Sequence, residues 1–312
     1  MPPENHHPPG ESVASRVPAP AGSRGLLPAL IRLARPLDWI KNVFVVLPLP
    51  FAVAGGAHFE AVSFLLGLAG FCLVNSAVYV LNDLCDAPAD RLHPRKCNRP
   101  IAAGVVPPLL AGIQIALLFP AGMALCVSAG KPGTAALVGL YIVLNLAYCL
   151  GAKHVALLDV FLLSAGFVIR VILGCVLVGA QPSGWLLLCT SALALFLGFV
   201  KRRADLTEGL DPGHRPSLHG YSMAFLDQAM TVSASLAMLS YALYCIEAKD
   251  TVLTPGRELA SMPFVLYGIL NYLRMAYLDN AGGSPVHAVL RSRTTQLCAL
   301  GWLIAILWGL KR

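Results

Sequence analysis

The chain has 312 residues, of which 57% are hydrophobic and only 12% are charged, and its mean hydropathy is +0.69. Soluble domains carry about twice that share of charged residues, so the composition excludes an ordinary soluble domain. The net charge of +7 is no evidence for a nucleic-acid partner, because the sequence has no nucleic-acid fold signature and basic loops set topology in membrane proteins. We therefore predict an all-α, polytopic membrane protein that binds no nucleic acid.

The N-terminal segment differs from the rest of the chain. Residues 1–25 are rich in Pro, Gly and Ser and lack the apolar core of a signal peptide. We predict a disordered, Pro-rich tail over residues 1–30 and one transmembrane domain over residues 31–312. Nine cysteines are scattered without a CxxC pair, which argues against a disulfide framework or a zinc site.

Apolar stretches long enough to cross a bilayer, which takes about 20 residues, recur along the chain. We expect nine spans, at 40–57, 60–81, 107–128, 133–151, 155–178, 184–200, 223–246, 261–278 and 294–310. Most of the 23 Lys and Arg residues fall in the N-terminal region and in every second connection after it. The positive-inside rule therefore predicts a plasma-membrane protein whose N-terminus lies in the cytoplasm and whose C-terminus lies outside.

The end of the second expected span carries acidic residues and then bases, in the stretch "VLNDLCDAPADRLHPRKCNRPIAAGV" (Val80–Val105). Asp83, Asp86 and Asp90 are spaced three and four apart, which places them within about 60° on one helix face. Like charges on one face repel unless a cation binds them. Carboxylate oxygens suit Mg²⁺, which completes its coordination with water and substrate phosphates. The pattern predicts a magnesium site at these aspartates, with Asn82 beside it, on the cytoplasmic side.

Pro88 lies between the second and third aspartates, and a proline inside a helix removes a backbone hydrogen bond. We expect the helix to break near Ala87 and Asp90 to lie in the following loop, which makes Asp83 and Asp86 the stronger candidates. A solvated acidic helix end is the alternative. The bases that follow favour instead a metal-bridged polyphosphate held by additional cations.

Arg170 lies inside an expected span, where an ionised side chain costs at least about 2.5 kcal/mol. Asp159 lies eleven residues earlier on the same helix face, about 16 Å away along the axis. That distance is too long for a direct ion pair, so we expect both side chains to line one cavity. An ion pair between Arg170 and another helix is the alternative.

The stretch "NDLCDAPAD" resembles the NDxxDxxxD pattern of the UbiA superfamily of intramembrane prenyltransferases. Further blocks resemble the branch of that superfamily that transfers phosphoribose to decaprenyl phosphate, and the similarity runs in order from about residue 30 to residue 310. The resemblance implies a bundle of nine transmembrane helices with a catalytic site open to the cytoplasm. The blocks are "RPLDWIKNVFV" (Arg35–Val45), "SAVYVLND" (Ser76–Asp83), "HPRKCNRPIAAGVVP" (His93–Pro107), "AYCLGAKH" (Ala147–His154), "IRVILG" (Ile169–Gly174) and "VKRRADL" (Val200–Leu206).

This branch implies Mg²⁺-dependent transfer of 5-phosphoribose from 5-phosphoribosyl diphosphate to a polyprenyl phosphate, with release of diphosphate. Typical superfamily members carry a second acidic motif after the sixth span, which holds a prenyl diphosphate. Here that region reads "KRRADLTEGLD", in which Lys201, Arg202 and Arg203 stand where acids are expected. Such a cationic segment suits direct phosphate binding. In the last cytoplasmic connection, Ser292 stands beside Arg293 where the family stretch usually has an acid.

The resemblance also assigns roles to individual residues. Asn82, Asp83 and Asp86 are the expected catalytic residues, and Asp83, Asp86 and Asp90 are the expected metal ligands. The expected substrate-binding residues are Lys41, Asp90, Lys96, Arg99, Lys153, His154, Arg170, Lys201, Arg202, Tyr221, Arg274 and Arg293.

The reaction needs little acid–base chemistry, because a lipid phosphate monoester is already an anion near pH 7. Catalysis would consist of holding two anions together and stabilising the charges that develop as the anomeric C–O bond breaks. One alternative is a UbiA-type enzyme that joins a prenyl diphosphate to an aromatic or other acceptor, which the basic segment disfavours. A transporter of anionic lipids is a second alternative. The concentration of charge at the cytoplasmic ends disfavours it.

Overall fold

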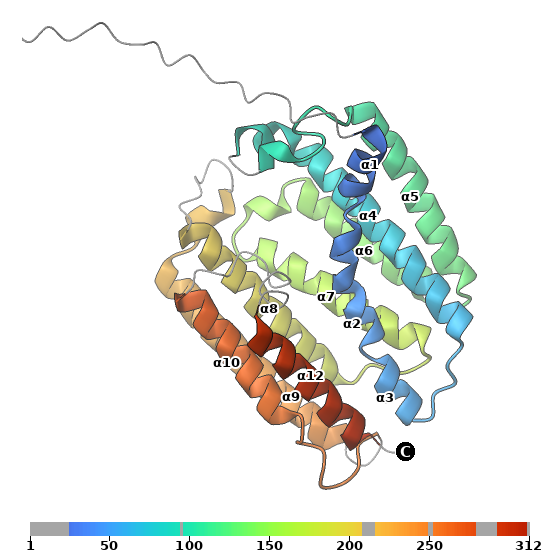
Figure 1. Cartoon of the computed structure of the whole chain (residues 1–312), viewed down its shortest axis with the longest axis vertical. Coiled ribbons are helices and arrows are strands. Elements are labelled where there is room, and N and C mark those ends of the chain that lie inside the picture. The colour runs from blue at the N-terminus through green and yellow to red at the C-terminus, as the bar shows by residue number, and fades with distance from the viewer. Residues whose placement is uncertain (1–24, 94–95, 208–215, 249–251, 279–291, 311–312) are drawn as a thin grey trace, which may run out of the picture.

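The computed structural model describes residues 25–93, 96–207, 216–248, 252–278 and 292–310, and these residues form a helical bundle (Figure 1). The longer helices are α1 (Leu26–Ala34), α4 (Ala61–Leu92), α5 (Pro108–Ser128), α6 (Thr134–Cys149), α7 (Leu158–Leu177), α8 (Gly184–Thr207), α9 (Met223–Ala248), α10 (Met262–Leu278) and α12 (Arg293–Gly309). The shorter elements are η1 (Pro36–Asn42), α2 (Val43–Val46), α3 (Leu49–Ala54), η2 (Lys96–Asn98), η3 (Ala152–His154) and η5 (Pro216–Gly220).

The order of the described helices follows the order of the expected spans, when α1 to α3 are taken as one broken segment. Six segments are long and apolar enough to cross a membrane: Leu26–Ala54, Ala61–Leu92, Pro108–Ser128, Leu158–Leu177, Gly184–Thr207 and Met223–Ala248. Helices α6, α10 and α12 are shorter, at 16, 17 and 17 residues. The protein is therefore an all-α, polytopic membrane protein with six helices of spanning length and hydropathy in the described part.

The first segment differs from the expected continuous span at 40–57. It begins at Leu26, inside the predicted tail, of which residues 1–24 lie outside the described residues. The helix breaks at Arg35, whose φ of 50° and ψ of 55° are left-handed, and Pro36 follows. A residue that precedes proline is disfavoured in the α conformation, which explains the break. A second proline, Pro48, separates α2 from α3.

The expected helix break near Ala87 is wrong, because α4 continues through Pro88 to Leu92. A proline inside a helix costs about 3 kcal/mol, so other contacts must offset it. Ala87 is buried with Ile101 and Ala111 in the cluster that joins α1, α4 and α5. This packing keeps the last turns of α4 helical, so Asp90 is a buried helical residue rather than a loop residue.

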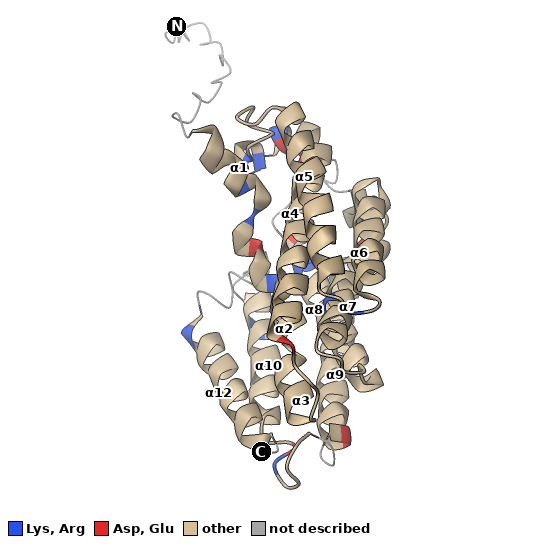
Figure 2. Cartoon of the chain, turned by 90° about the vertical axis from the view of Figure 1, so that its right-hand side faces the viewer, with Lys and Arg blue, Asp and Glu red and all other residues tan. Residues whose placement is uncertain are grey.

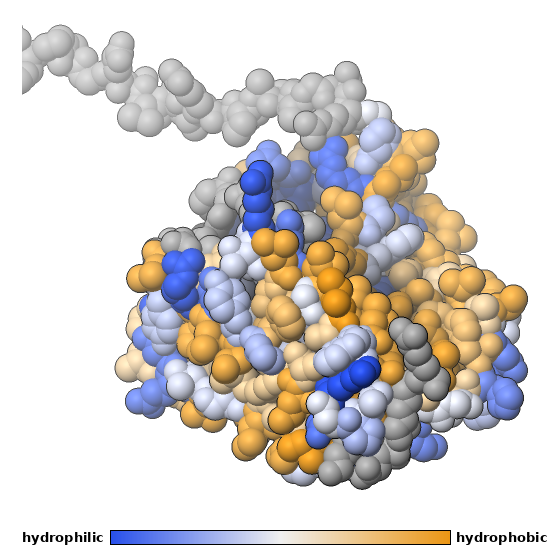
Figure 3. Space-filling view, turned by 60° about the horizontal axis from the view of Figure 1, so that its bottom comes forward, coloured by the Kyte–Doolittle hydropathy of each residue, from blue (hydrophilic) through white to orange (hydrophobic). Residues whose placement is uncertain are grey.

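The helices pack mainly as neighbours: α4 on α5, α6 on α7, α7 on α8, α8 on α9 and α10 on α12, while α2 lies against α7. A Cβ on Gly174 of α7 would overlap the backbone of Val45, so only glycine permits this approach of α2. Charges on α5, α6 and α12 are confined to the helix ends or absent (Figure 2). Hydrophobic side chains cover much of the outer face shown in Figure 3, as expected of a surface in contact with lipid.

Candidate active site

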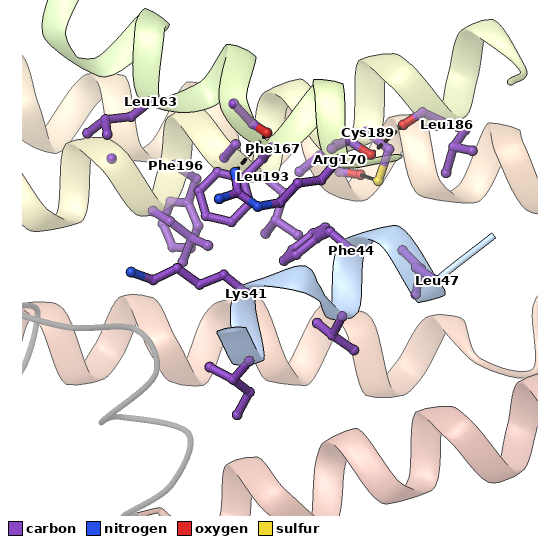
Figure 4. A pocket seen from close by; sticks show the side chains of 18 of the residues that line it. Lys41, Phe44, Leu47, Leu163, Phe167, Arg170, Leu186, Cys189, Leu193 and Phe196 are labelled. Atoms are coloured by element: carbon purple, nitrogen blue, oxygen red, sulfur yellow. Dashed lines mark hydrogen bonds between the residues drawn. The ribbon is translucent and has the colours of Figure 1, made fainter. Parts of the chain in front are cut away.

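A cavity of about 2380 Å³ lies inside the bundle and is lined from η1 to α12. In Figure 4, Lys41 of η1 and Phe44 of α2 lie on one side of this space, opposite Phe167 and Arg170 of α7 and Phe196 of α8. Most of the lining is apolar. The charged lining residues gather mainly at one end, where α4, α6 and α8 finish and where α5, α7 and α9 begin.

Among the described residues, basic side chains outnumber carboxylates at this charged end. The described carboxylates that line it are Asp86, Asp90 and Asp205. The basic residues that line it come from five connections or helix ends: Arg35, Lys41, His93, Lys96, Arg99, Lys153, His154 and Lys201. This region of the cavity is therefore suited to hold several phosphate groups close together.

Arg99 joins the first and last aspartates of α4. Its Nη1 lies 3.0 Å from Oδ1 of Asp83 and 2.7 Å from Oδ2 of Asp90, so the two carboxylates share one helix face as predicted. Nη2 of Arg35 donates a second bond of 2.6 Å to Asp83. Asp83 is only 2% exposed and is not among the lining residues. The ranking of the aspartates thus differs from the expectation, since Asp90 lines the cavity and Asp83 lies behind it.

Asp86 is held by an amide and an amine. Nδ2 of Asn82 donates to its Oδ2 at 3.0 Å, and the amine of Lys153 bonds its Oδ1. Sγ of Cys149 lies 3.5 Å from the Asn82 carbonyl oxygen, which fixes the orientation of that amide. Lys153, expected from its sequence block alone, is thereby placed beside the predicted metal site.

The oxygen ligands at this end of the cavity suit a Mg²⁺ ion that also binds the phosphate oxygens of a substrate. Within the described residues no three His, Cys, Asp or Glu side chains are arranged to hold a metal ion. Asn82, Asp86 and Asp90 nevertheless present oxygen ligands to the cavity, and Mg²⁺ in phosphate sites commonly uses one or two carboxylates and completes its coordination with substrate oxygens. The expected three-aspartate cage is absent from the described residues, but a two-carboxylate site fits.

Lys41 faces the cavity from η1. Its Nζ lies 2.6 Å from Oδ1 of Asp38 and 3.1 Å from the hydroxyl of Tyr79. The Lys41 amine and the Arg35 guanidinium both lie over the Tyr79 ring, 5.3 and 5.2 Å from its centroid. Asp38, Tyr79 and Arg35 were not among the expected site residues, although all three belong to the sequence blocks that carry the resemblance.

Arg170 lines the cavity as expected, but neutral groups rather than a carboxylate surround its guanidinium. It is 4% exposed, and no described carboxylate lies within ion-pair distance of it. The guanidinium donates to Asn42 at 3.1 Å, to the Gly166 carbonyl at 2.8 Å and to the Tyr141 hydroxyl at 3.0 Å. Aromatic rings surround it at 5.0 to 5.4 Å. Neutral acceptors and ring faces thus surround and stabilise this buried guanidinium.

Besides Asp83, four of the expected substrate-binding residues do not line the cavity. Arg202 is buried behind the wall, where it pairs with Asp159, and Tyr221 bonds the same carboxylate. The expectation that Asp159 shares the cavity with Arg170 is therefore wrong. Arg274 and Arg293 are exposed and are also absent from the lining.

Ser292, the residue at the family's acidic position, has a local structural role. It is the N-cap of α12, and its hydroxyl accepts a hydrogen bond of 3.3 Å from the backbone N–H of Thr295. Ser and Asp are both favoured N-cap residues, so a serine replaces an acid here without loss of the cap. Residues 208–211 of the second motif lie outside the described residues.

The fold is one that solved structures already show. It matches a solved UbiA homologue from Archaeoglobus fulgidus bound to GPP and Mg²⁺, with a TM-score of 0.68 over 90% of this chain and 98% of that chain, at 16% identity. The structure described as digeranylgeranylglyceryl phosphate synthase matches with a TM-score of 0.65 over 91% and 98%, at 15% identity. At these identities the likeness shows the fold alone.

The chain belongs to the UbiA prenyltransferase family, whose model matches residues 42–283. It is similar to the decaprenyl-phosphate phosphoribosyltransferase of Corynebacterium glutamicum, at 35% identity over 91% of this chain and 87% of that protein. The enzyme of the same name from Mycobacterium tuberculosis is 34% identical over 95% and 97%. The resemblance to this branch, read from the sequence blocks, is confirmed.

Proposed function

We propose that this protein transfers 5-phosphoribose from 5-phosphoribosyl diphosphate to a polyprenyl phosphate of the decaprenyl type. Two relatives are named decaprenyl-phosphate phosphoribosyltransferase. They are about a third identical to this chain over nine-tenths of its length. The observation that carries the proposal is the excess of lysines and arginines around Asp86 and Asp90 at one end of the cavity.

The number of phosphate groups explains why this excess is needed. The donor brings a 5-phosphate and a diphosphate, and the lipid acceptor brings a third group. Two substrates of like charge repel each other, so the protein must supply positive charge from several directions. Lys41, Lys153 and Lys201 come from three different elements that line the cavity, and we assign them, with Lys96 and Arg99, to phosphate binding.

We assign Asn82, Asp86 and Asp90 to holding Mg²⁺ with the donor's diphosphate. When bound, the ion neutralises the diphosphate and stabilises the charge that grows on it as it leaves. Asp83 has a supporting role in this scheme, because it holds Arg35 and Arg99 in place. Carboxylates close to the bound ribose would stabilise the positive charge that develops at its anomeric carbon.

The apolar part of the cavity is assigned to the polyprenyl chain. Ile40 and Val43 line the cavity yet remain 47% and 55% exposed, and Thr295 and Ala299 of α12 also line it. We propose that these residues lie along the entrance through which a chain in the membrane reaches the interior. A lipid phosphate that enters with its chain among apolar side chains would place its head group toward the charged end.

The protein residues then act by binding, orienting and excluding water. The lipid phosphate oxygen attacks the anomeric carbon, the C–O bond to diphosphate breaks, and the diphosphate leaves with the bonding electrons. No residue has to remove a proton, because the acceptor is already an anion. The apolar walls shield the reacting centre from water, which would otherwise hydrolyse the donor.

The proposal is tested with purified protein, Mg²⁺, decaprenyl phosphate and ribose-labelled phosphoribosyl diphosphate. We expect label to enter the lipid fraction, and to do so only when the lipid phosphate is present. A parallel reaction offers labelled geranyl diphosphate with an aromatic acceptor. Label transferred from the prenyl donor but not from the ribose donor would establish the alternative, ordinary prenyl transfer.

A further inference from the structure

A buried ion network lies behind the charged wall of the cavity. The side chain of Arg202 is fully buried, with Nε 2.7 Å from Oδ2 of Asp159 and Nη1 2.7 Å from Oδ2 of Asp205. Asp159 is fully buried as well. Asp205 is the member that reaches the cavity. The contact with Asp159 is an ion pair without hydrogen-bond geometry, whereas Nη1 donates a hydrogen bond to Asp205.

Asp159 is held from a second side by the segment that leads into α9. The hydroxyls of Tyr221 and Ser217 donate to it at 2.7 and 3.0 Å. The Tyr221 oxygen also accepts the backbone N–H of Leu157 at 2.7 Å. Leu157 has a φ of 67°, which residues other than glycine rarely adopt, so this bond holds an uncommon backbone conformation. Burial and the bond to Asp159 raise the pKa of Tyr221, so its hydroxyl remains a donor at physiological pH.

The network connects the segments that carry two of the site lysines. Leu157 follows η3, which carries Lys153, and Arg202 follows Lys201 at the end of α8. The η5 turn packs closely on the segment that carries Lys153, because a Cβ on Gly220 would overlap the Cβ of Ala156. Helix α7, which follows Leu157, also packs directly on α8, where a Cβ on Gly198 would overlap Val160.

We propose that Asp159, Arg202 and Tyr221 are positioning residues that form a clamp between the Lys153 segment and the Lys201 segment. This inference rests on the proposed function, because the clamp sets the spacing of cations that bind two different phosphate groups. Lys153 bonds Asp86. The position of Lys153 relative to Lys201 therefore also sets the position of Asp86 relative to the wall of the cavity that α8 forms. Arg202 and Tyr221 thus act without touching substrate.

The clamp is tested with Tyr221→Phe, which removes one hydroxyl, and Arg202→Lys, which keeps the charge but loses the forked geometry. The control is Arg203→Lys on the next residue of α8. Arg203 pairs with Asp227 at 2.7 Å and with the Ala276 carbonyl at 2.9 Å, away from the cavity lining. Hydrogen–deuterium exchange without substrate reports on the segments, and initial-rate kinetics report KM and kcat.

We expect both clamp variants to exchange faster over residues 152–160 and 216–222, and to raise the KM for phosphoribosyl diphosphate about 10-fold or more, since small displacements of a positioned group have effects of this size. The Arg203→Lys protein should show neither change. Unaltered exchange in the two segments overturns the clamp. Faster exchange with an unaltered KM also overturns it, because that is the result of a purely structural role. If the wild-type protein transfers no phosphoribose, only the proposed function fails, because the exchange measurement needs no substrate.

Discussion

At the scale of the residue, the site is a set of carboxylates whose partners are cations. Asp83 and Asp90 share Arg99, and Asp86 bonds Lys153. The sequence predicted the shared face of the aspartates because helical periodicity is local. It did not predict which carboxylate reaches the cavity, because that depends on contacts with Arg35 and Arg99, which lie outside α4.

Lys153 offers the sharpest single-residue prediction. Lys153→Met removes a cation that both orients Asp86 and lines the cavity. We expect kcat/KM for phosphoribosyl transfer to fall by about 100-fold or more, which is typical when one group that stabilises developing charge is lost. The matched control is Lys131→Met, because Lys131 pairs with Glu60 at 3.1 Å and does not line the cavity. Equal losses in the two variants would contradict a specific role for Lys153.

At the scale of the element, one rule about proline in helices failed and another explained the structure. The rule that proline breaks helices failed in α4, where packing on α1 and α5 keeps Pro88 helical. The rule that a residue before proline leaves the α conformation explains the break at Arg35. Local sequence therefore predicted the type of element well. The end of α4, in contrast, was decided by its packing on α1 and α5.

Ser292 provides a prediction about an element. If it serves as the N-cap of α12, Ser292→Ala should destabilise the protein by about 1 kcal/mol, whereas Ser292→Asp should retain the cap. Thermal unfolding in detergent measures both. Transfer activity of the Ala variant should stay within about twofold of wild type below its unfolding temperature, because the residue does not line the cavity. A large loss of activity in a stable Ala variant would assign Ser292 to the site instead.

At the scale of the whole molecule, the hydropathy pattern and the sequence blocks predicted a helical membrane bundle with its charge at one end. The cavity, the cage around Arg170 and the network at Arg202 depend on contacts between helices distant in sequence, so no local pattern revealed them. Arg170 illustrates the difference. Its place inside a span was evident from the sequence, but its partners Asn42, Tyr141 and Gly166 come from three elements.

The distribution of basic residues makes a prediction about orientation. If the charged end of the cavity faces the cytoplasm, externally added phosphoribosyl diphosphate should support transfer in inside-out vesicles. It should not do so in sealed right-side-out vesicles, because the donor is a membrane-impermeant anion. Detergent should restore activity to the latter. Full activity in sealed right-side-out vesicles would reverse the orientation.

The mass of the lipid product is the most direct test of phosphoribosyl transfer by this protein. When purified protein is incubated with decaprenyl phosphate, phosphoribosyl diphosphate and Mg²⁺, we predict one new lipid, decaprenyl phosphate that carries a single 5-phosphoribosyl group. Its amount should equal the diphosphate released, because one bond forms for each that breaks. A lipid extended by prenyl units, or diphosphate released without any new lipid, would contradict the account.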